Sequence, residues 1–146
     1  MKKPFSFEEF KSIYSRVPRL SVDVVIKMDG GIVLVERALE SYKGQWQLPG
    51  GTLYFKEKVV DAAKRLAKEE TGLLVEPKDV LGYIEYHSEE KERGFGYTIG
   101  LVLSCELVGG KIHLNNEGSE LKTFAVLPQN MVIDQKQFLE SLGYRS

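Results

Sequence analysis

The chain has little cysteine and no long apolar run. Its single cysteine, Cys105, excludes a disulfide within the chain and stands in an apolar segment, where we expect a small buried side chain in a reducing compartment. No apolar stretch approaches the roughly 20 residues that span a bilayer, so we expect no membrane partner. The basic start of the chain is not followed by an apolar run either, which argues against a signal peptide. These absences favour a cytoplasmic protein.

An excess of charge of one sign is also lacking. The 146 residues carry a formal net charge of -1, so no overall field attracts nucleic acid, and we expect no nucleic-acid partner. A hydrophobic content of 42% and a charged content of 28% are ordinary for a globular protein. This length is enough for one core, so we expect residues 1–146 to form a single domain.

Three segments have the apolar spacing of helices. The first, residues 6–17, opens with the Ser-x-x-Glu form of a capping box, and we expect its apolar stripe to pack on the core rather than on a partner. The second covers residues 56–71, and Gly72 is placed to end it. The third begins near Asp134, with a glutamine three residues later as its capping partner.

Between the helices the sequence alternates as strands do. Residues 20–28 and 32–36 are joined by an Asp-Gly-Gly turn and predict a hairpin. Further strands are expected at residues 80–86, 97–108, 111–114 and 121–127, with the charged link 87–94 as an exposed loop. Strands that flank a central helix, with helices at both ends, predict an α/β layered domain with a mixed sheet.

One helical residue conflicts with its surroundings. In the segment 56–71, a turn of about 100° per residue places Glu70 on the same face as Val59 and Leu66. A carboxylate on an apolar face must be neutralised or paired. Glu69 lies at the edge of that face. Paired acids beside a glycine-rich loop favour a hard divalent cation, so the sequence predicts chemistry at this position.

Residues 51–73 resemble the Nudix box. The family pattern has a Gly, a Glu, then Arg-Glu, an aliphatic residue, any residue, Glu-Glu, any residue, Gly and an aliphatic residue. Only Leu66 departs from it, standing where a glutamate is usual; the matching residues are Gly51, Glu57, Arg65, Glu69, Glu70, Gly72 and Leu73. The resemblance extends over residues 20–127. It implies a Nudix-like α/β/α sandwich with a central mixed β-sheet.

The resemblance implies an enzyme that hydrolyses a nucleoside diphosphate linked to another group X, with Mg²⁺ or Mn²⁺. A divalent ion neutralises the phosphate oxygens and lowers the pKa of its bound water. The implied ligands are Glu69, Glu70 and the Gly50 carbonyl, with Glu57 supporting the cluster. Arg65 resembles the residue that orients a glutamate, since it lies one turn before Glu69. The alternative for that pair is an ordinary surface salt bridge.

The departure at Leu66 matters, because a leucine neither binds metal nor acts as a base. One subgroup, the GDP-mannose mannosyl hydrolases, carries the same Arg-Leu and breaks the bond at the sugar carbon. The resemblance to that subgroup implies that Asp23 and Arg37 contact the substrate, the arginine neutralising a diphosphate leaving group. The alternatives are a strand-edge acid and a solvated cation. Trp46 is a candidate for stacking on a base, or else a core residue.

The late loop departs from that subgroup, which has a histidine base there, whereas residues 115–120 contain none. Glu117 or Glu120 is therefore the candidate base or additional metal ligand, because an acid near other acids has a raised pKa without metal. Hydrolysis at phosphorus is the leading hypothesis. The alternatives are a GDP-sugar glycosyl hydrolase that releases GDP and sugar, and a catalytically weak nucleotide-binding or regulatory domain. The resemblance also implies a homodimer, with helix 6–17 contributing.

Overall fold

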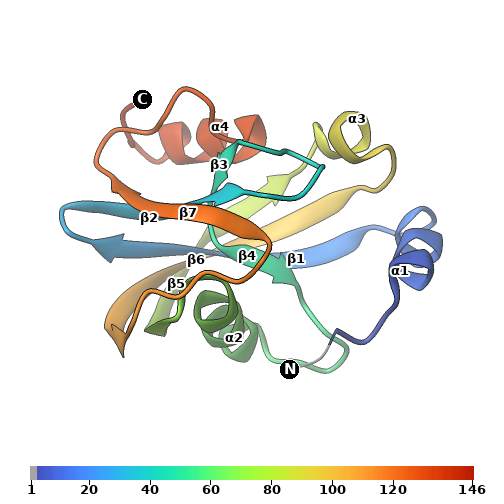
Figure 1. Ribbon diagram of the computed structural model, residues 1–146, viewed down its shortest axis with the longest axis horizontal. Helices are drawn as coiled ribbons and strands as arrows, with labels where there is room; N and C mark the ends of the chain where they lie inside the picture. Colours follow the sequence, from blue (N-terminus) through green and yellow to red (C-terminus); the bar gives the residue numbers. More distant parts are fainter. Residues whose placement is uncertain (1–2) are drawn as a thin grey trace.

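The structure, a computed structural model that describes residues 3–146, is built on a seven-stranded mixed β-sheet (Figure 1). β1 and β6 run parallel, with Arg19 opposite Thr98 and Ile26 opposite Cys105. The pairs β1–β2, β1–β4, β2–β3, β2–β7 and β5–β6 are antiparallel. The strands are β1 (Arg19–Met28), β2 (Gly31–Arg37), β3 (Trp46–Gln47), β4 (Gly50–Thr52), β5 (Leu73–Glu85), β6 (Thr98–Gly110) and β7 (Gly118–Phe124).

Helices cover both faces of this sheet (Figure 1). On one face, apolar residues of α2 (Val59–Thr71) share a core cluster with Val22, Val24 and Ile26 of β1. On the other face, Leu139 of α4 (Ile133–Ser141) shares a second cluster with Val25. Alternate residues of β1 thus enter different clusters, as a strand covered on both sides requires. The predicted α/β sandwich with a central mixed sheet is confirmed.

Local backbone conformation sets the two ends of α2. The helix begins three residues later than predicted, because Lys56 has a left-handed φ of 64° and Lys58 is the extended N-cap. Gly72 ends it as predicted, with φ 78° and its N–H donating to the Lys68 carbonyl at 2.9 Å. A Cβ at position 72 would lie 2.1 Å from the Lys111 carbonyl oxygen. Glycine is therefore required for both its conformation and its close approach.

The N-terminal helix α1 (Phe7–Tyr14) is capped as the sequence predicts. Ser6 Oγ accepts a hydrogen bond from the Glu9 N–H at 3.2 Å, and Glu9 Oε1 accepts one from the Ser6 N–H at 3.1 Å. The helix is shorter than residues 6–17, and none of its residues is buried. The expected packing on the core is met in part, because α1 lies at the end of the sheet and Phe10 contacts the buried Phe95 edge to face.

Four further predictions about individual elements are wrong. Segment 87–94 is not simply an exposed loop, since it contains the short helix α3 (Glu89–Arg93), whose first residue is buried. Residues 111–114 are not a strand, and β7 begins earlier than expected, at Gly118. Asp134 does not begin a capping box, because Val132 is the N-cap of α4 and Asp134 accepts a hydrogen bond from the Ser88 N–H at 3.2 Å.

Cys105 lies in β6 and is buried, as expected. Burial raises the pKa of its thiol to about 11, so the thiol stays protonated at neutral pH. No helix within residues 3–146 is long and apolar enough to cross a membrane.

Candidate active site

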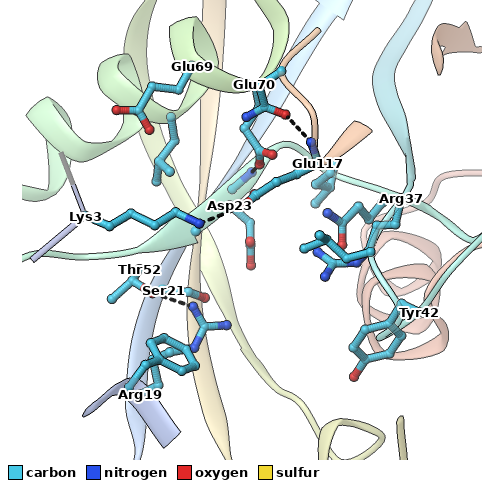
Figure 2. A pocket seen from close by; sticks show the side chains of 18 of the residues that line it. Lys3, Arg19, Ser21, Asp23, Arg37, Tyr42, Thr52, Glu69, Glu70 and Glu117 are labelled. Atoms are coloured by element: carbon cyan, nitrogen blue, oxygen red, sulfur yellow. Dashed lines mark hydrogen bonds and ion pairs between the residues drawn. The ribbon is translucent and has the colours of Figure 1, made fainter. Parts of the chain in front are cut away.

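A cavity of about 480 Å³ lies where β1, β4 and α2 meet the N-terminal segment (Figure 2). β4 lies antiparallel to β1, with Gly50 opposite Asp23, so the loop of the Nudix-box resemblance is held against the central strand. The cavity brings together most of the site residues that the sequence predicts, namely Asp23, Arg37, Gly50, Arg65, Glu69, Glu70 and Glu117.

Glu70 is buried at the C-terminal end of α2, with 7% of its surface exposed. The backbone N–H of Gly50 donates a hydrogen bond of 2.8 Å to its Oε1. Burial raises the pKa of this carboxyl to about 7, and the negative charges of Glu117 and Asp23 add to the effect. The acid expected on an apolar helical face is thus present there and faces the backbone of the preceding loop.

Arg65 joins α2 to the loop between β4 and α2 through a bidentate contact with Glu57. Its Nε donates to Glu57 Oε2 at 2.7 Å and its Nη2 to Glu57 Oε1 at 2.9 Å. Nη2 also donates to the Thr52 carbonyl at 2.9 Å, and Nη1 to Glu69 Oε2 at 3.3 Å. The hydrogen bonds from Arg65 lower the pKa of Glu57. Because the Arg65 side chain is only 10% exposed, its pair with Glu57 is not a solvated surface contact.

Asp23 belongs to a buried chain of hydrogen bonds that reaches α4. Tyr86 Oη donates to Asp23 Oδ2 at 2.7 Å, and Gln135 Nε2 donates to Tyr86 Oη at 2.9 Å. The Leu48 N–H donates to Gln135 Oε1 at 2.7 Å, which fixes the orientation of the amide. Burial raises the pKa of Asp23 to about 6. Asp23 lies in a central strand, so the strand-edge alternative is wrong.

Arg37 lies at the end of β2 with its guanidinium held by one residue of the following loop. Its Nε donates to the Ser41 carbonyl at 2.8 Å, and its Nη2 donates to Ser41 Oγ at 3.0 Å. Burial lowers the pKa of this guanidinium, while the charges of Glu70 and Glu117 partly restore it. Arg37 is therefore a held, half-buried cation at the cavity and not a solvated one.

The remaining predicted residues lie in different surroundings. Glu117 lines the cavity, and Lys3 Nζ lies 2.6 Å from its Oε1 (Figure 2). Glu120 does not line it, because β7 begins at Gly118 and places this side chain beside Lys122, at 3.4 Å. Trp46 is buried in the core and lies outside the cavity, so of its two alternatives it is the core residue and does not stack on a base there.

The donor atoms at the cavity suit Mg²⁺ or Mn²⁺, which prefer oxygen ligands. The carboxylates of Glu69, Glu70 and Glu117 line it together with Gly50. The raised pKa of Glu70 marks a buried acid whose charge a cation would stabilise. Within residues 3–146, no three acidic, histidine or cysteine side chains are already gathered closely enough to hold an ion. The chemistry of the donors fits a divalent cation, whereas Lys3 holds Glu117 in this arrangement.

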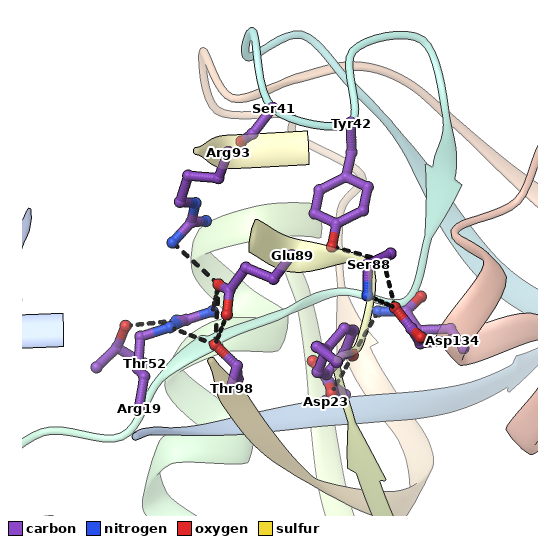
Figure 3. A network of polar contacts seen from close by, with 12 residues as sticks. Arg19, Asp23, Ser41, Tyr42, Thr52, Ser88, Glu89, Arg93, Thr98 and Asp134 are labelled. Atoms are coloured by element: carbon purple, nitrogen blue, oxygen red, sulfur yellow. Dashed lines mark hydrogen bonds and ion pairs between the residues drawn. The ribbon is translucent and has the colours of Figure 1, made fainter. Parts of the chain in front are cut away.

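Sequence reasoning missed a second polar cluster, at the α1 end of the cavity (Figure 3). Glu89 is buried and accepts the Thr98 hydroxyl at 2.7 Å, while Arg93 Nη1 lies 3.2 Å from its Oε2. Arg19 donates to Thr98 Oγ1 at 3.1 Å and to Thr52 Oγ1 at 2.7 Å. The four-residue spacing of Glu89 and Arg93 is a local signal for the pair, but nothing local indicates their burial.

Comparison with known proteins agrees with the fold and the motif. The NUDIX domain matches residues 17–142. The chain is 32% identical over 120 residues to the low-salt glycan biosynthesis protein Agl8 of Haloferax volcanii, covering 80% of this chain and 77% of that protein. It is 34% identical over 107 residues to an ADP-ribose pyrophosphatase of Methanocaldococcus jannaschii, covering 73% and 62%. A solved MutT NUDIX hydrolase from Burkholderia pseudomallei has a TM-score of 0.76 and 26% identity, covering 86% of this chain and 98% of that one. The chain belongs to the Nudix hydrolase family.

Proposed function

We propose that this chain hydrolyses the pyrophosphate of a nucleoside diphosphate linked to another group X, using Mg²⁺ or Mn²⁺. The observation that carries the proposal is the buried Glu70, fixed by the Gly50 N–H in a cavity that Glu69 and Glu117 also line. The similarity to a protein named ADP-ribose pyrophosphatase supports a nucleotide substrate.

The proposed metal ligands are Glu69, Glu70, Glu117 and the Gly50 carbonyl. When bound, the ion neutralises phosphate charge and lowers the pKa of a coordinated water. Glu57 does not line the cavity, and both of its carboxylate oxygens accept hydrogen bonds from Arg65. This pair is therefore proposed to position the loop and α2 relative to each other. Glu117 is the proposed base or additional ligand, and Lys3 would leave it when it takes that role.

Arg37 is the proposed phosphate contact. Its guanidinium is held by Ser41 and faces the cavity, so little side-chain freedom is lost when it meets an anion. The acids of the cavity repel a diphosphate, and a fixed cation among them offsets part of that repulsion.

A GDP-sugar glycosyl hydrolase is the second candidate. Asp23, Arg37 and Leu66, the residues of the mannosyl hydrolase resemblance, all line the one cavity. One relative carries a name in glycan biosynthesis, which favours a sugar as the X group. A binding domain without activity is the third candidate, motivated by Leu66.

Product analysis in ¹⁸O-labelled water separates the three candidates. ADP-ribose and GDP-mannose are incubated with Mg²⁺ or Mn²⁺, and the products are resolved by chromatography and mass spectrometry. Attack at phosphorus gives a nucleoside monophosphate and a sugar phosphate, one of which carries the label on phosphate. Attack at carbon gives the nucleoside diphosphate and a labelled free sugar. No turnover of either compound, together with binding of both, identifies the binding domain.

We also propose a homodimer to which α1 contributes. No residue of α1 is buried within the chain, and Phe7 is 69% exposed. Analytical ultracentrifugation tests this, with Phe7→Ser expected to shift the protein towards the monomer. A wild-type protein that sediments as a monomer contradicts the proposal.

A further inference from the structure

The floor of the cavity carries a buried hydroxyl that the protein leaves without a partner. Arg19, Ser21 and Asp23 alternate along β1 and all line the cavity (Figure 2). Ser21 is 2% exposed, and in the part of the chain that the structure describes its Oγ is the buried side-chain atom without a hydrogen bond. Proteins rarely bury such a group, because its lost hydration is not replaced. A ligand that enters the cavity would satisfy it.

Residue 100 on the neighbouring strand packs so closely against this hydroxyl that only a glycine fits there. Gly100 lies opposite Ser21 in the parallel pair of β1 and β6. A Cβ at this position would lie 2.5 Å from Asp23 Oδ2, 2.9 Å from Ser21 Oγ and 2.9 Å from Tyr86 Cε2. The backbone of Gly100 is not in the left-handed region, so its conformation does not require glycine. What requires glycine is the close approach of two side chains of β1 and of Tyr86, the residue after β5.

We propose that Ser21 and Asp23, neighbours on the cavity face of β1, form a subsite for two neighbouring hydroxyl groups of a sugar in the substrate. A carboxylate only accepts hydrogen bonds, so the ligand must donate to Asp23. The Ser21 hydroxyl both donates and accepts, which suits the adjacent hydroxyl of the same ring. A phosphate is disfavoured there, because the Asp23 carboxylate repels it. The nearby Arg19 already donates to Thr52 and Thr98.

The subsite is rigid before any ligand binds. Tyr86 holds Asp23 Oδ2, and Gln135 holds Tyr86 from α4. The orientation of Gln135 is set in turn by the Leu48 N–H. A ligand therefore meets fixed acceptors and loses little of its binding free energy to ordering of the protein. The inference rests on the proposed function, since it assumes that a sugar nucleotide enters this cavity.

Binding of an analogue that water cannot cleave tests the subsite apart from catalysis. The probe is α,β-methylene ADP-ribose with Mg²⁺, followed by titration calorimetry on wild type and Ser21→Ala. Because Ser21 Oγ makes no bond to the described protein, the variant is expected to keep the wild-type Tm or exceed it. Its Kd should rise about five- to thirty-fold, the loss of one or two good hydrogen bonds. Ser104→Ala is the matched control, since this serine lies on β6 outside the cavity and its Kd should be unchanged.

Two dideoxy analogues identify which sugar the subsite takes. One lacks both ring hydroxyls of the adenosine ribose, and the other lacks those of the terminal ribose. The analogue without the recognised hydroxyls should bind wild type and Ser21→Ala equally, while the other should still discriminate between them. Gly100→Ala places a methyl group within 3.0 Å of Ser21 Oγ and Asp23 Oδ2, so it displaces both side chains and should abolish the discrimination. If Gly100→Ala also lowers the Tm, the comparison of wild type with Ser21→Ala decides.

The inference is overturned if Ser21→Ala binds all three analogues as wild type does. It is also overturned if wild type binds neither α,β-methylene ADP-ribose nor α,β-methylene GDP-mannose. Failure of the proposed function has a different signature, since it shows as tight, Ser21-dependent binding of the analogues without hydrolysis of the natural pyrophosphates.

Discussion

Gly50 donates its backbone N–H to Glu70 Oε1 over 2.8 Å and so joins the loop before α2 to the last turn of that helix. This bond places one acidic oxygen and the Gly50 backbone side by side, although they are 20 residues apart. It holds the carboxylate in place even though burial disfavours its charge. Glu70 therefore has two separable roles, one as the acceptor of this hydrogen bond and one as a negative charge. A glutamine amide keeps the first role, because its oxygen can accept the Gly50 N–H, and lacks the second.

Glu70→Gln should therefore keep the fold and lose the chemistry. The glutamine Oε1 accepts the Gly50 N–H, and a neutral amide is easier to bury than a carboxylate, so the Tm should stay the same or rise. The loss of a charged ligand should lower kcat/KM on the order of a hundredfold or more. Scanning calorimetry and steady-state kinetics with Mg²⁺ measure the two effects. Glu106→Gln, on the exposed face of β6, is the control, and near-normal turnover by Glu70→Gln would refute the metal assignment.

Arg65→Lys should destabilise the protein although the charge is conserved. A lysine cannot make the parallel pair of bonds to Glu57 and also reach the Thr52 carbonyl. We expect the free energy of unfolding to fall by about 2 kcal/mol. Catalysis should fall as well, because the loop that carries Gly50 loses its anchor to α2.

A double-mutant cycle with Glu57→Gln checks that interpretation by urea denaturation. If the two residues act as one unit, the double variant should lose much less stability than the sum of the two single losses. Strictly additive losses would show that Arg65 stabilises the protein through other contacts.

Local signals in the sequence account for the parts of the fold that were predicted correctly. The capping box at Ser6 and the left-handed Gly72 are set by residues within one helical turn. The motif of residues 51–73 is likewise local, a loop and the helix that follows it. For that reason Glu57, Arg65, Glu69 and Glu70 could be placed near one another without knowledge of the sheet.

The contacts that the sequence did not reveal depend on the tertiary arrangement. Tyr86 reaches Asp23 across 63 residues, and Lys3 reaches Glu117 across 114, so no periodicity reveals either contact. Glu89 belongs to a charged run that is typical of an exposed loop, but Thr98 and Arg93 satisfy it in the interior. The period-two pattern of β1 could have indicated that Ser21 shares the face of Asp23.

Leu66→Glu should not restore a better enzyme, although glutamate is usual at this position. Leu66 is 5% exposed and belongs to the core cluster under α2, while a Cβ on Gly51 would lie 2.8 Å from its Cδ2. A glutamate there buries a second charge one turn before Glu70, and we expect a loss of about 2–4 kcal/mol in unfolding free energy. Leu66→Met conserves volume and should cost less than about 1.5 kcal/mol. A large gain in kcat with unchanged Tm for Leu66→Glu would place this residue among the metal ligands instead.

Asp23 should make the stability of the metal-free protein depend on pH. Burial raises its folded pKa from an ordinary value of 3.8 to about 6. The folded state therefore holds this proton more tightly than the unfolded chain does. The resulting stability is present below pH 3.8 and is lost as pH rises through 6, a total of about 3 kcal/mol.

The difference between wild type and Asp23→Asn isolates this effect, because other carboxylates titrate in the same range in both proteins. An asparagine Oδ1 can still accept the Tyr86 hydroxyl, so the variant keeps that bond but no longer titrates. Urea denaturation in EDTA from pH 4 to pH 8 measures the free energy of unfolding of both proteins. The value for Asp23→Asn minus that for wild type should rise by about 3 kcal/mol, with most of the change between pH 4 and pH 6. Parallel stability curves across that range would mean that Asp23 titrates normally and that a charged carboxylate costs nothing at the floor of the cavity.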